Sequence, residues 1–207
     1  MTLGRCDGIV LAAGAGTRYG RPKVLAADGN WLRSAVAALR GGGCAEVVVV
    51  LGASGPARPS ASGGWQISEQ PAIELPAEAR PVWAADWATG MSASLRSGLG
   101  ALAESGPAAA DYAAIMPVDT PDVGPAVVAR VLAAARAASS GLARAVFGEA
   151  PGHPVVIGHE HWTNVIDSAR GDSGARAYLD KRPDMVAVTC DDLATGRDHD
   201  YPHNRAQ

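Results

Sequence analysis

The sequence predicts an α/β fold, with a mostly parallel mixed sheet that carries helices on both faces. Residues 8–13 are a short, continuous apolar run, and residues 46–51 contain four consecutive valines; both patterns are typical of strands buried on both faces. Helix-like segments alternate with such runs along the chain, and this order favours parallel strands joined by helical crossovers. The 207 residues are enough to bury roughly 70% of the unfolded surface, so one domain spanning 1–207 is expected.

The first elements alternate clearly. Residues 8–13 form a strand that ends in Gly14-Ala15-Gly16, and residues 31–40 form a helix that stops at three consecutive glycines. Four consecutive valines make residues 46–51 a second buried strand. Residues 52–64 are rich in Gly, Pro, Ser and Ala, which predicts a mobile loop.

The middle of the chain continues the alternation. Residues 82–84 predict a short strand, and residues 92–103 a helix. Met91, Leu95, Leu99 and Leu102 would form the apolar stripe of that helix. A strand is expected over 112–116, and a long helix over 125–138.

The last third has a different character. Residues 142–147 and 154–157 predict two strands in a hairpin-like stretch, so one antiparallel insertion is expected in the sheet. Helices over 159–169 and 174–181 and a strand over 185–189 follow, and the tail from 196 is polar.

Composition excludes several classes of protein. The net charge of −3 argues against a nucleic-acid coat or a binder of anionic membranes. The three cysteines are Cys6, Cys44 and Cys190; their odd number and wide spacing predict buried thiols in a reducing compartment, without a disulfide framework. The N-terminus does not predict a signal peptide, and no apolar run reaches the roughly 18 residues of a membrane span. A soluble, cytoplasmic protein is therefore expected.

A glycine-rich loop with cations follows the first strand. It reads Leu11-Ala12-Ala13-Gly14-Ala15-Gly16-Thr17-Arg18-Tyr19-Gly20-Arg21-Pro22-Lys23. Its glycines allow backbone N–H groups to turn inward as an anion nest, and its three cations fit a triphosphate. The alternative is a tight turn with solvated surface cations.

Two other phosphate-binding loops fit poorly. The P-loop pattern GxxxxGK[ST] is absent. The spacing of Gly14, Gly16 and Gly20 is one residue too long for GxGxxG. Pro22 would interrupt any helix that begins at Thr17. A nicotinamide-dependent oxidoreductase is therefore weakly supported, and binding of NAD(P)H would test it.

The loop resembles the signature of nucleotidyltransferases of the molybdenum-cofactor and sugar-nucleotide superfamily. Further segments are similar to the molybdenum-cofactor cytidylyltransferase branch (MobA/MocA-related): WATGMSASL at 87–95, MPVDTP at 116–121, GHPV at 152–155, GDSGAR at 171–176 and DHDYP at 198–202. The matches span nearly the whole chain in the family's order. They imply a three-layer Rossmann-like nucleotidyltransferase fold.

The resemblance implies a role for each motif. Lys23, Arg18 and Asp119 would be catalytic, the two cations acting on the phosphates of the nucleotide. The nucleotide-binding residues would be Leu11, Ala12, Ala13, Gly14, Gly16, Arg18, Lys23, Gly90 and Ser94. For Gly90 and Ser94, the alternative is that Ser92 or Ser94 caps a helix.

The resemblance also implies Asp119 and Asp200 as ligands of Mg²⁺, which prefers carboxylate and phosphate oxygens. Asp119 could instead cap the helix near 125, although Asp122 fits that role better. Asp198 is an equally placed rival of Asp200. Tyr201 stands where the family has threonine, which alters the local geometry.

The identities of the nucleotide base and of the acceptor are predicted from weaker sequence signals. Ala12-Ala13 is similar to the form seen in the cytidylyl branch, whereas Ala84 stands where family members carry asparagine. His153 and Asp172 are the candidates for acceptor binding, with a cap on the helix at 174 as the alternative for Asp172. The histidines and the glutamate at 159–161, 199 and 203 match no established zinc spacing.

The resemblance implies a Mg²⁺-dependent enzyme that transfers CMP from CTP to the phosphate of molybdopterin and releases pyrophosphate. Alternatives are GTP as donor, or a sugar, polyol or phospholactate phosphate as acceptor. A different class is a non-catalytic nucleotide-binding protein of cofactor maturation. A molybdoenzyme or its maturation factor would be a protein partner, with no nucleic acid or membrane.

Overall fold

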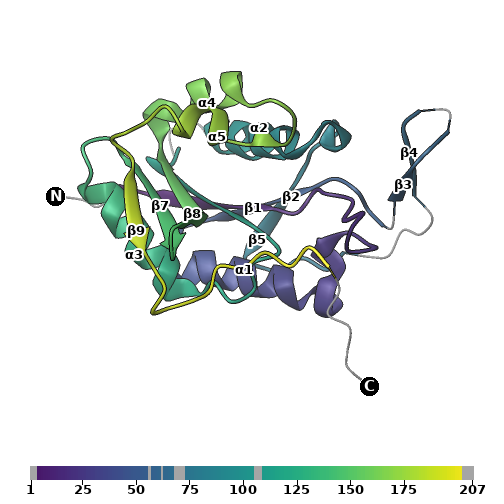
Figure 1. Ribbon diagram of the computed structural model, residues 1–207, viewed down its shortest axis with the longest axis horizontal. Helices are drawn as coiled ribbons and strands as arrows, with labels where there is room; N and C mark the ends of the chain where they lie inside the picture. Colours follow the sequence, from purple (N-terminus) through teal and green to yellow (C-terminus); the bar gives the residue numbers. More distant parts are fainter. Residues whose placement is uncertain (1–3, 56, 62, 68–72, 105–108, 202–207) are drawn as a thin grey trace.

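The computed structural model describes residues 4–55, 57–61, 63–67, 73–104 and 109–201. Its main sheet has seven strands in the order β5-β2-β1-β6-β8-β7-β9. Helices α1 and α3 cover one face of this sheet, and α2, α4 and α5 cover the other (Figure 1). The predicted α/β fold with a mostly parallel mixed sheet is confirmed.

Four parallel strands form one half of the sheet: β1 (Cys6–Leu11), β2 (Val47–Leu51), β5 (Ala79–Trp83) and β6 (Tyr112–Pro117). Along β1, Ile9 and Val10 are both fully buried but belong to different cores, one on each face of the sheet. Successive side chains of a strand point to opposite faces, so burial on both faces requires a continuous apolar run.

The predicted antiparallel insertion is also present. Strands β7 (Leu142–Phe147) and β8 (Ala150–Gly158) pair as a hairpin, and β8 lies antiparallel to β6. The final strand, β9 (Val186–Thr189), pairs parallel to β7 at the edge of the sheet.

The long helices match their predicted ranges to within a residue or two. They are α1 (Asn30–Gly41), α2 (Met91–Ala103) and α3 (Pro125–Ala137). Met91 is 44% exposed, so it does not belong to the buried stripe of α2 as expected. It is the first residue of the helix and lies beyond the part that packs on the sheet.

The later helices are shorter than predicted. The expected helix over 159–169 begins with the 3₁₀ turn η4 (His159–His161) and continues as α4 (Trp162–Ser168). The expected helix over 174–181 is reduced to the single turn α5 (Arg176–Leu179). It follows another 3₁₀ turn, η5 (Gly171–Ser173), and Gly174 with a φ of +54° separates the two. A positive φ is incompatible with a right-handed helix.

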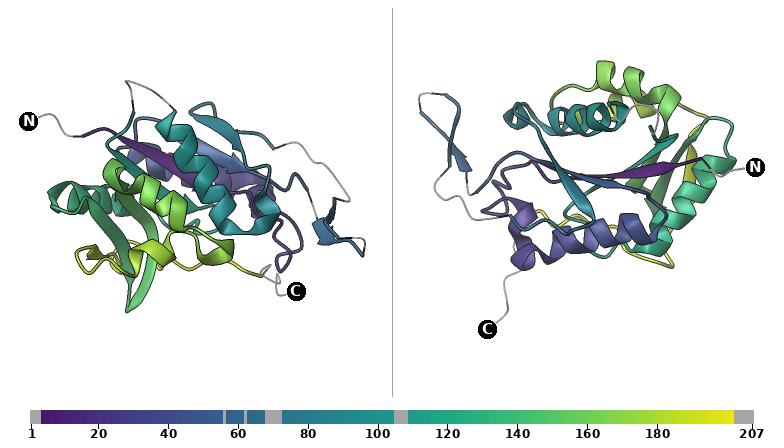
Figure 2. Two further views of the ribbon diagram at one scale, coloured as in Figure 1. Left: turned by 90° about the horizontal axis from the view of Figure 1, so that it is seen from above. Right: turned by 180° about the vertical axis from the view of Figure 1, so that it is seen from behind.

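The expected loop over 52–64 contains a strand. β3 (Ala57–Pro59) pairs antiparallel with β4 (Trp65–Ile67) in a separate two-stranded sheet. Gly63 and Gly64, with φ values of +82° and +86°, turn the chain between them, and the N–H of Ser60 donates to the carbonyl oxygen of Gly64. The glycines therefore serve a tight turn. Figure 2 shows this hairpin standing away from the main sheet.

The cysteines are free and buried, as predicted. The Sγ atoms of Cys6 and Cys44 lie 3.8 Å apart, and this neighbour together with burial raises the pKa of the Cys6 thiol. In the described part of the chain, no helix combines the length and the apolar character that a bilayer crossing requires.

Candidate active site

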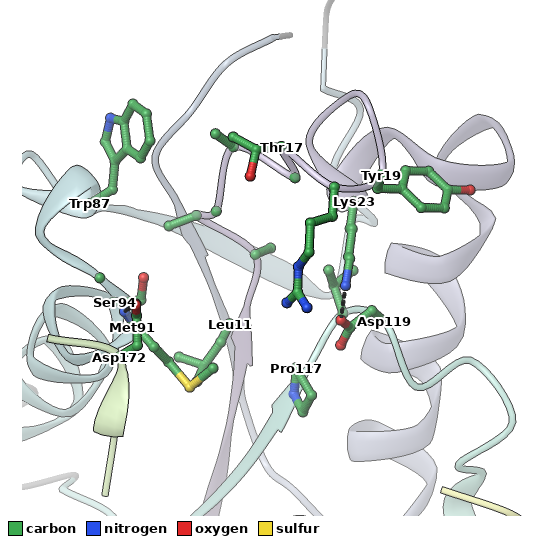
Figure 3. A pocket seen from close by; sticks show the side chains of 18 of the residues that line it. Leu11, Thr17, Tyr19, Lys23, Trp87, Met91, Ser94, Pro117, Asp119 and Asp172 are labelled. Carbon is green, nitrogen blue, oxygen red and sulfur yellow. Dashed lines mark hydrogen bonds and ion pairs between the residues drawn. The ribbon is translucent and has the colours of Figure 1, made fainter. Parts of the chain in front are cut away.

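A cavity of about 670 Å³ opens where β1 and β6 end. Leu11 and Pro117 are register partners in these adjacent parallel strands, so the segments that follow them emerge side by side. In open α/β sheets, ligands bind at this carboxyl edge. All the residues predicted to bind nucleotide line the cavity: Leu11, Ala12, Ala13, Gly14, Gly16, Arg18, Lys23, Gly90 and Ser94. Figure 3 shows the side chains around it.

The glycine loop has a fixed backbone. Gly16 has a φ of +60°, and a Cβ there would overlap the carbonyl oxygen of Arg21. The N–H of Gly20 donates to the carbonyl oxygen of Gly16 at 2.8 Å. A Cβ at Gly14 would meet no atom within 4 Å, so this part of the loop faces open space. Pro22 then precedes the 3₁₀ segment η1 (Lys23–Gly29), which makes Lys23 its first residue.

Lys23 links two carboxylates from distant segments. Its Nζ lies 2.6 Å from Asp119 Oδ2 (Figure 3) and 2.9 Å from Asp200 Oδ1. Burial by itself lowers the pKa of Lys23, but the two carboxylates outweigh burial and raise that pKa above its ordinary value. The ammonium group is therefore charged across the physiological pH range.

Asp200 also forms an ion pair with a second cationic side chain. Arg18 Nη1 lies 2.8 Å from Asp200 Oδ2, and the Arg18 side chain is 64% exposed. The hydrogen bond from Lys23 lowers the pKa of Asp200 below its usual range. The rival carboxylate, Asp198, does not line the cavity. The tail that carries Asp200 is held by the N–H of His199, which donates to the carbonyl oxygen of Asp119 at 3.2 Å.

The two carboxylate oxygens of Asp119 differ in their hydrogen bonding. Oδ2 accepts from Lys23, whereas Oδ1 is buried and has no hydrogen-bond partner among the described residues. A buried oxygen of this kind needs a partner, because desolvation without a hydrogen bond is costly. Mg²⁺ is commonly held by one or two carboxylates together with substrate phosphates. Asp119 and Asp200 thus fit a divalent cation that arrives with a phosphate ligand.

Asp122, the better of the two candidates for a cap on the following helix, does not cap it. Its Oδ2 accepts from the N–H and the hydroxyl of Thr195 at 2.7 and 2.6 Å and from the N–H of Gly196 at 3.2 Å. Helix α3 begins after Gly124 and has no side-chain cap. Proline at position 125 supplies no N–H, which removes one of the donors that a cap would satisfy. Asp122 therefore fixes the C-terminal tail.

Asp172 lines the other end of the cavity. The predicted alternative, a cap on the helix at 174, is wrong, because Oδ1 of Asp172 accepts from the N–H of Met91 at 3.2 Å. It thereby caps α2 from a separate segment. Gly90 has a φ of +113°, and a Cβ there would lie 2.6 Å from this same oxygen. Glycine is thus required where the two segments meet.

His153, the second acceptor candidate, lies on β8 and does not line the cavity. Burial, reinforced by the Arg144 cation, lowers the pKa of His153 to about 4. The imidazole is therefore neutral at physiological pH. The structure brings Asp172, and not His153, to the cavity wall.

No cluster of three or more metal-ligating side chains occurs among the described residues. His161 is hydrogen-bonded to the Tyr178 hydroxyl and to the Ser140 carbonyl oxygen, both at 2.7 Å. Its ring nitrogens are engaged in the fold. His203 lies outside the described residues.

Two tryptophans that line the cavity had no predicted role. Trp87 belongs to η2 (Trp87–Thr89), at the start of the motif WATGMSASL, and Trp65 belongs to β4. Trp87 could have been singled out by its place beside Gly90. Trp65 carried no local signal, because its segment was expected to adjoin an irregular loop.

Comparison with known proteins gives one family and consistent structural neighbours. The family described as "MobA-like NTP transferase domain" matches residues 8–186. Nicotine blue oxidoreductase from Paenarthrobacter nicotinovorans is 31% identical over 202 residues, which cover 93% of this chain and 91% of that protein.

Several solved structures share the fold. The Rv0371c homolog from Mycobacterium sp. strain JC1 has a TM-score of 0.69 at 23% identity, covering 95% of this chain and 91% of that one. A manganese complex of Rv0371c from Mycobacterium tuberculosis H37Rv has a TM-score of 0.62 at 23% identity, covering 90% and 88%. The 2-C-methyl-D-erythritol 4-phosphate cytidylyltransferase from Thermus thermophilus has a TM-score of 0.57 at 20% identity, covering 94% and 93%.

Proposed function

This chain belongs to the MobA-like NTP transferase family, and on that premise we propose that it transfers CMP from CTP to the phosphate of molybdopterin. The observation that carries the proposal is the cluster of Lys23, Arg18, Asp119 and Asp200 at the end of the glycine loop. It combines phosphate-binding cations with carboxylates that fit a divalent cation. Such a site meets the main difficulty of nucleotidyl transfer, which is the repulsion between two anions.

In the proposed reaction, a phosphate oxygen of the acceptor attacks the α-phosphorus of the nucleotide. A new P–O bond forms, the bond to the β-phosphate bridging oxygen breaks, and pyrophosphate leaves with that electron pair. The loop N–H groups around Gly14 would hold the β- and γ-phosphates. Arg18 would offer its forked donors to the leaving pyrophosphate, and Lys23 would hold the α-phosphate.

The carboxylates keep both cations in position without a nucleotide. Lys23 and Arg18 are already paired with Asp119 and Asp200, so their charges lie where the phosphates would bind. Binding would exchange carboxylate oxygens for phosphate oxygens, which leaves Asp119 and Asp200 free to hold Mg²⁺. A bound Mg²⁺ would neutralise phosphate charge and fix the geometry of the triphosphate.

The choice of CTP and molybdopterin depends on finer features. Ala12-Ala13 at the strand exit is similar to the cytidylyl branch and lines the cavity. Ala84 is fully buried in the core, so that position offers no polar contact to a base. Asp172, which lies on the cavity wall, would serve the acceptor. GTP as donor and a sugar, polyol or phospholactate phosphate as acceptor remain competing proposals, and a molybdoenzyme or its maturation factor would receive the product.

The test is pyrophosphate release with each of the four NTPs, Mg²⁺ and a panel of acceptors that includes molybdopterin. Asp119→Asn should abolish release while nucleotide binding remains measurable, and Lys23→Met should lose both. Lys181 and Asp192 are exposed and provide the matched controls. Lys181→Met and Asp192→Asn should release pyrophosphate at wild-type rates. If the wild type releases no pyrophosphate with any pair, the transferase proposal fails and the non-catalytic nucleotide-binding protein is favoured.

A second candidate function is a nicotinamide-dependent oxidoreductase, and one observation favours it. The relative that is 31% identical carries the name of an oxidoreductase. In that reaction, hydride would pass from NAD(P)H to an electron-accepting ring, with a proton from solvent. Oxidation of NADPH, followed by its absorbance with nicotine blue as acceptor, distinguishes this activity from pyrophosphate release.

A further inference from the structure

Two tryptophans from separate segments meet in the wall of the cavity. Trp87 comes from η2, and Trp65 comes from the β3–β4 hairpin. Their ring centroids lie 5.3 Å apart, with the ring planes tilted by 50°. Both side chains are half-buried, so each keeps ring surface accessible.

Trp87 is held close to the glycine loop. A Cβ at Gly52 would lie 2.5 Å from the Cβ of Trp87 and 2.6 Å from the carbonyl oxygen of Ala13. The N–H of Ala53 donates to that same carbonyl oxygen at 2.9 Å. The absence of a side chain at Gly52 therefore allows Trp87 to pack next to Ala13, at the end of the loop remote from Lys23.

The cavity thus has two chemically different ends. In Figure 3, Trp87 lies on one side of Leu11 at the β1 exit, and Lys23 and Asp119 lie on the other. The volume of about 670 Å³ is within the range of small-molecule sites. One end offers cations to phosphates, and the other offers the faces of indole rings.

The hairpin gives Trp65 its place. The hairpin stands away from the main sheet (Figure 1), yet its tryptophan contacts Trp87 and lines the cavity. Aromatic side chains bind bases by stacking, and stacking tolerates different bases because each has a π-face.

We propose that Trp65 and Trp87 form a stacking wall for the planar heteroaromatic ring of a ligand whose phosphates bind at Lys23 and Arg18. The inference deepens the proposed function and rests on it for the identity of the ring as a nucleotide base. A nicotinamide dinucleotide would present the same chemistry, a planar ring joined to phosphates. Trp65 would then be a determinant of affinity for the ring, supplied by an element outside the main sheet.

The test is isothermal titration of CTP, GTP, NADPH and inorganic tripolyphosphate, each with Mg²⁺, into the wild type and Trp65→Ala. Tripolyphosphate carries the phosphates without a ring. We expect Trp65→Ala to weaken binding of the ring-bearing ligand about tenfold and to leave tripolyphosphate unchanged. Trp65→Phe should restore most of the affinity. The matched control is Trp83→Ala, because Trp83 is 58% exposed on the edge strand β5 and does not line the cavity.

The outcomes separate this inference from the proposed function. If Trp65→Ala binds every ring-bearing ligand like the wild type, or loses tripolyphosphate to the same extent, the stacking wall is refuted even where pyrophosphate release is normal. If the wild type releases no pyrophosphate but binds NADPH in a Trp65-dependent manner, the transferase proposal fails and the stacking wall is supported. A raised KM for the nucleotide in Trp65→Ala supports both.

Discussion

Replacing Lys23 by methionine should destabilise the metal-free protein and make it more responsive to divalent cations. Lys23 makes two charge-assisted hydrogen bonds, to Asp119 and Asp200, and its side chain is only 16% exposed. Hydrogen bonds to charged groups contribute about 1.5–3 kcal/mol each. The two carboxylates can rehydrate through the open cavity, which lowers the net cost to about 2 kcal/mol in total. For a chain of this size, that corresponds to a fall in Tm of about 4–8 °C.

The same variant leaves two carboxylates without their shared cation, beside Oδ1 of Asp119, which has no hydrogen-bond partner in the described part of the chain. A divalent cation should therefore bind Lys23→Met without a nucleotide more tightly than it binds the wild type. Thermal unfolding with and without millimolar Mg²⁺ or Mn²⁺ measures this, and the Tm of the variant should recover in the metal arm. Lys181→Met should match the wild type in both arms. A Tm for Lys23→Met that is lowered equally with and without metal would refute the carboxylate pair as a cation site.

Three further outcomes follow from the geometry. Gly16→Ala forces a side chain into a φ of +60° against Arg21, so it should cost about 1–3 kcal/mol and weaken tripolyphosphate binding in titration, whereas Gly14→Ala, in open space, should stay folded. Asp172→Ala removes the cap of α2 and should lower stability in urea by about 1 kcal/mol, with Asp172→Asn closer to the wild type. Because the pKa of His153 is lowered to about 4, the unfolded chain binds the extra proton between about pH 4 and pH 6.5. The free energy of unfolding should therefore rise with pH across that window. In His153→Gln, urea titrations should show that this part of the pH dependence is lost.

The backbone of the site could be predicted from the sequence. A buried strand, the glycines of the loop and Pro22 before Lys23 each act on neighbouring peptide units, so their effect is visible in a short stretch of chain. The same holds for the order of strands and helices, because apolar periodicity reports which faces are buried. The hairpin at 57–67 escaped prediction because its glycines indicate a turn and a mobile loop equally well.

The partners of the polar side chains could not be predicted in the same way. Asp200 rather than Asp198 meets Lys23, 177 positions away, and Asp172 caps α2 across 81 positions. Asp122 fitted the cap of the next helix better than Asp119 did, yet it holds the tail that carries Asp200 to the cavity.

The sequence by itself determined the α/β order of elements, the glycine loop with its cations and the set of residue types available for chemistry. The tertiary structure alone decided which carboxylate shares Lys23, which aspartate caps α2 and that Trp65 joins Trp87 at the cavity. The physical reason is the distance along the chain over which each kind of interaction acts. Backbone dihedral preferences act over a few residues, whereas hydrogen bonds, ion pairs and ring contacts require atoms within a few ångströms, and only the folded path of the whole chain sets those distances.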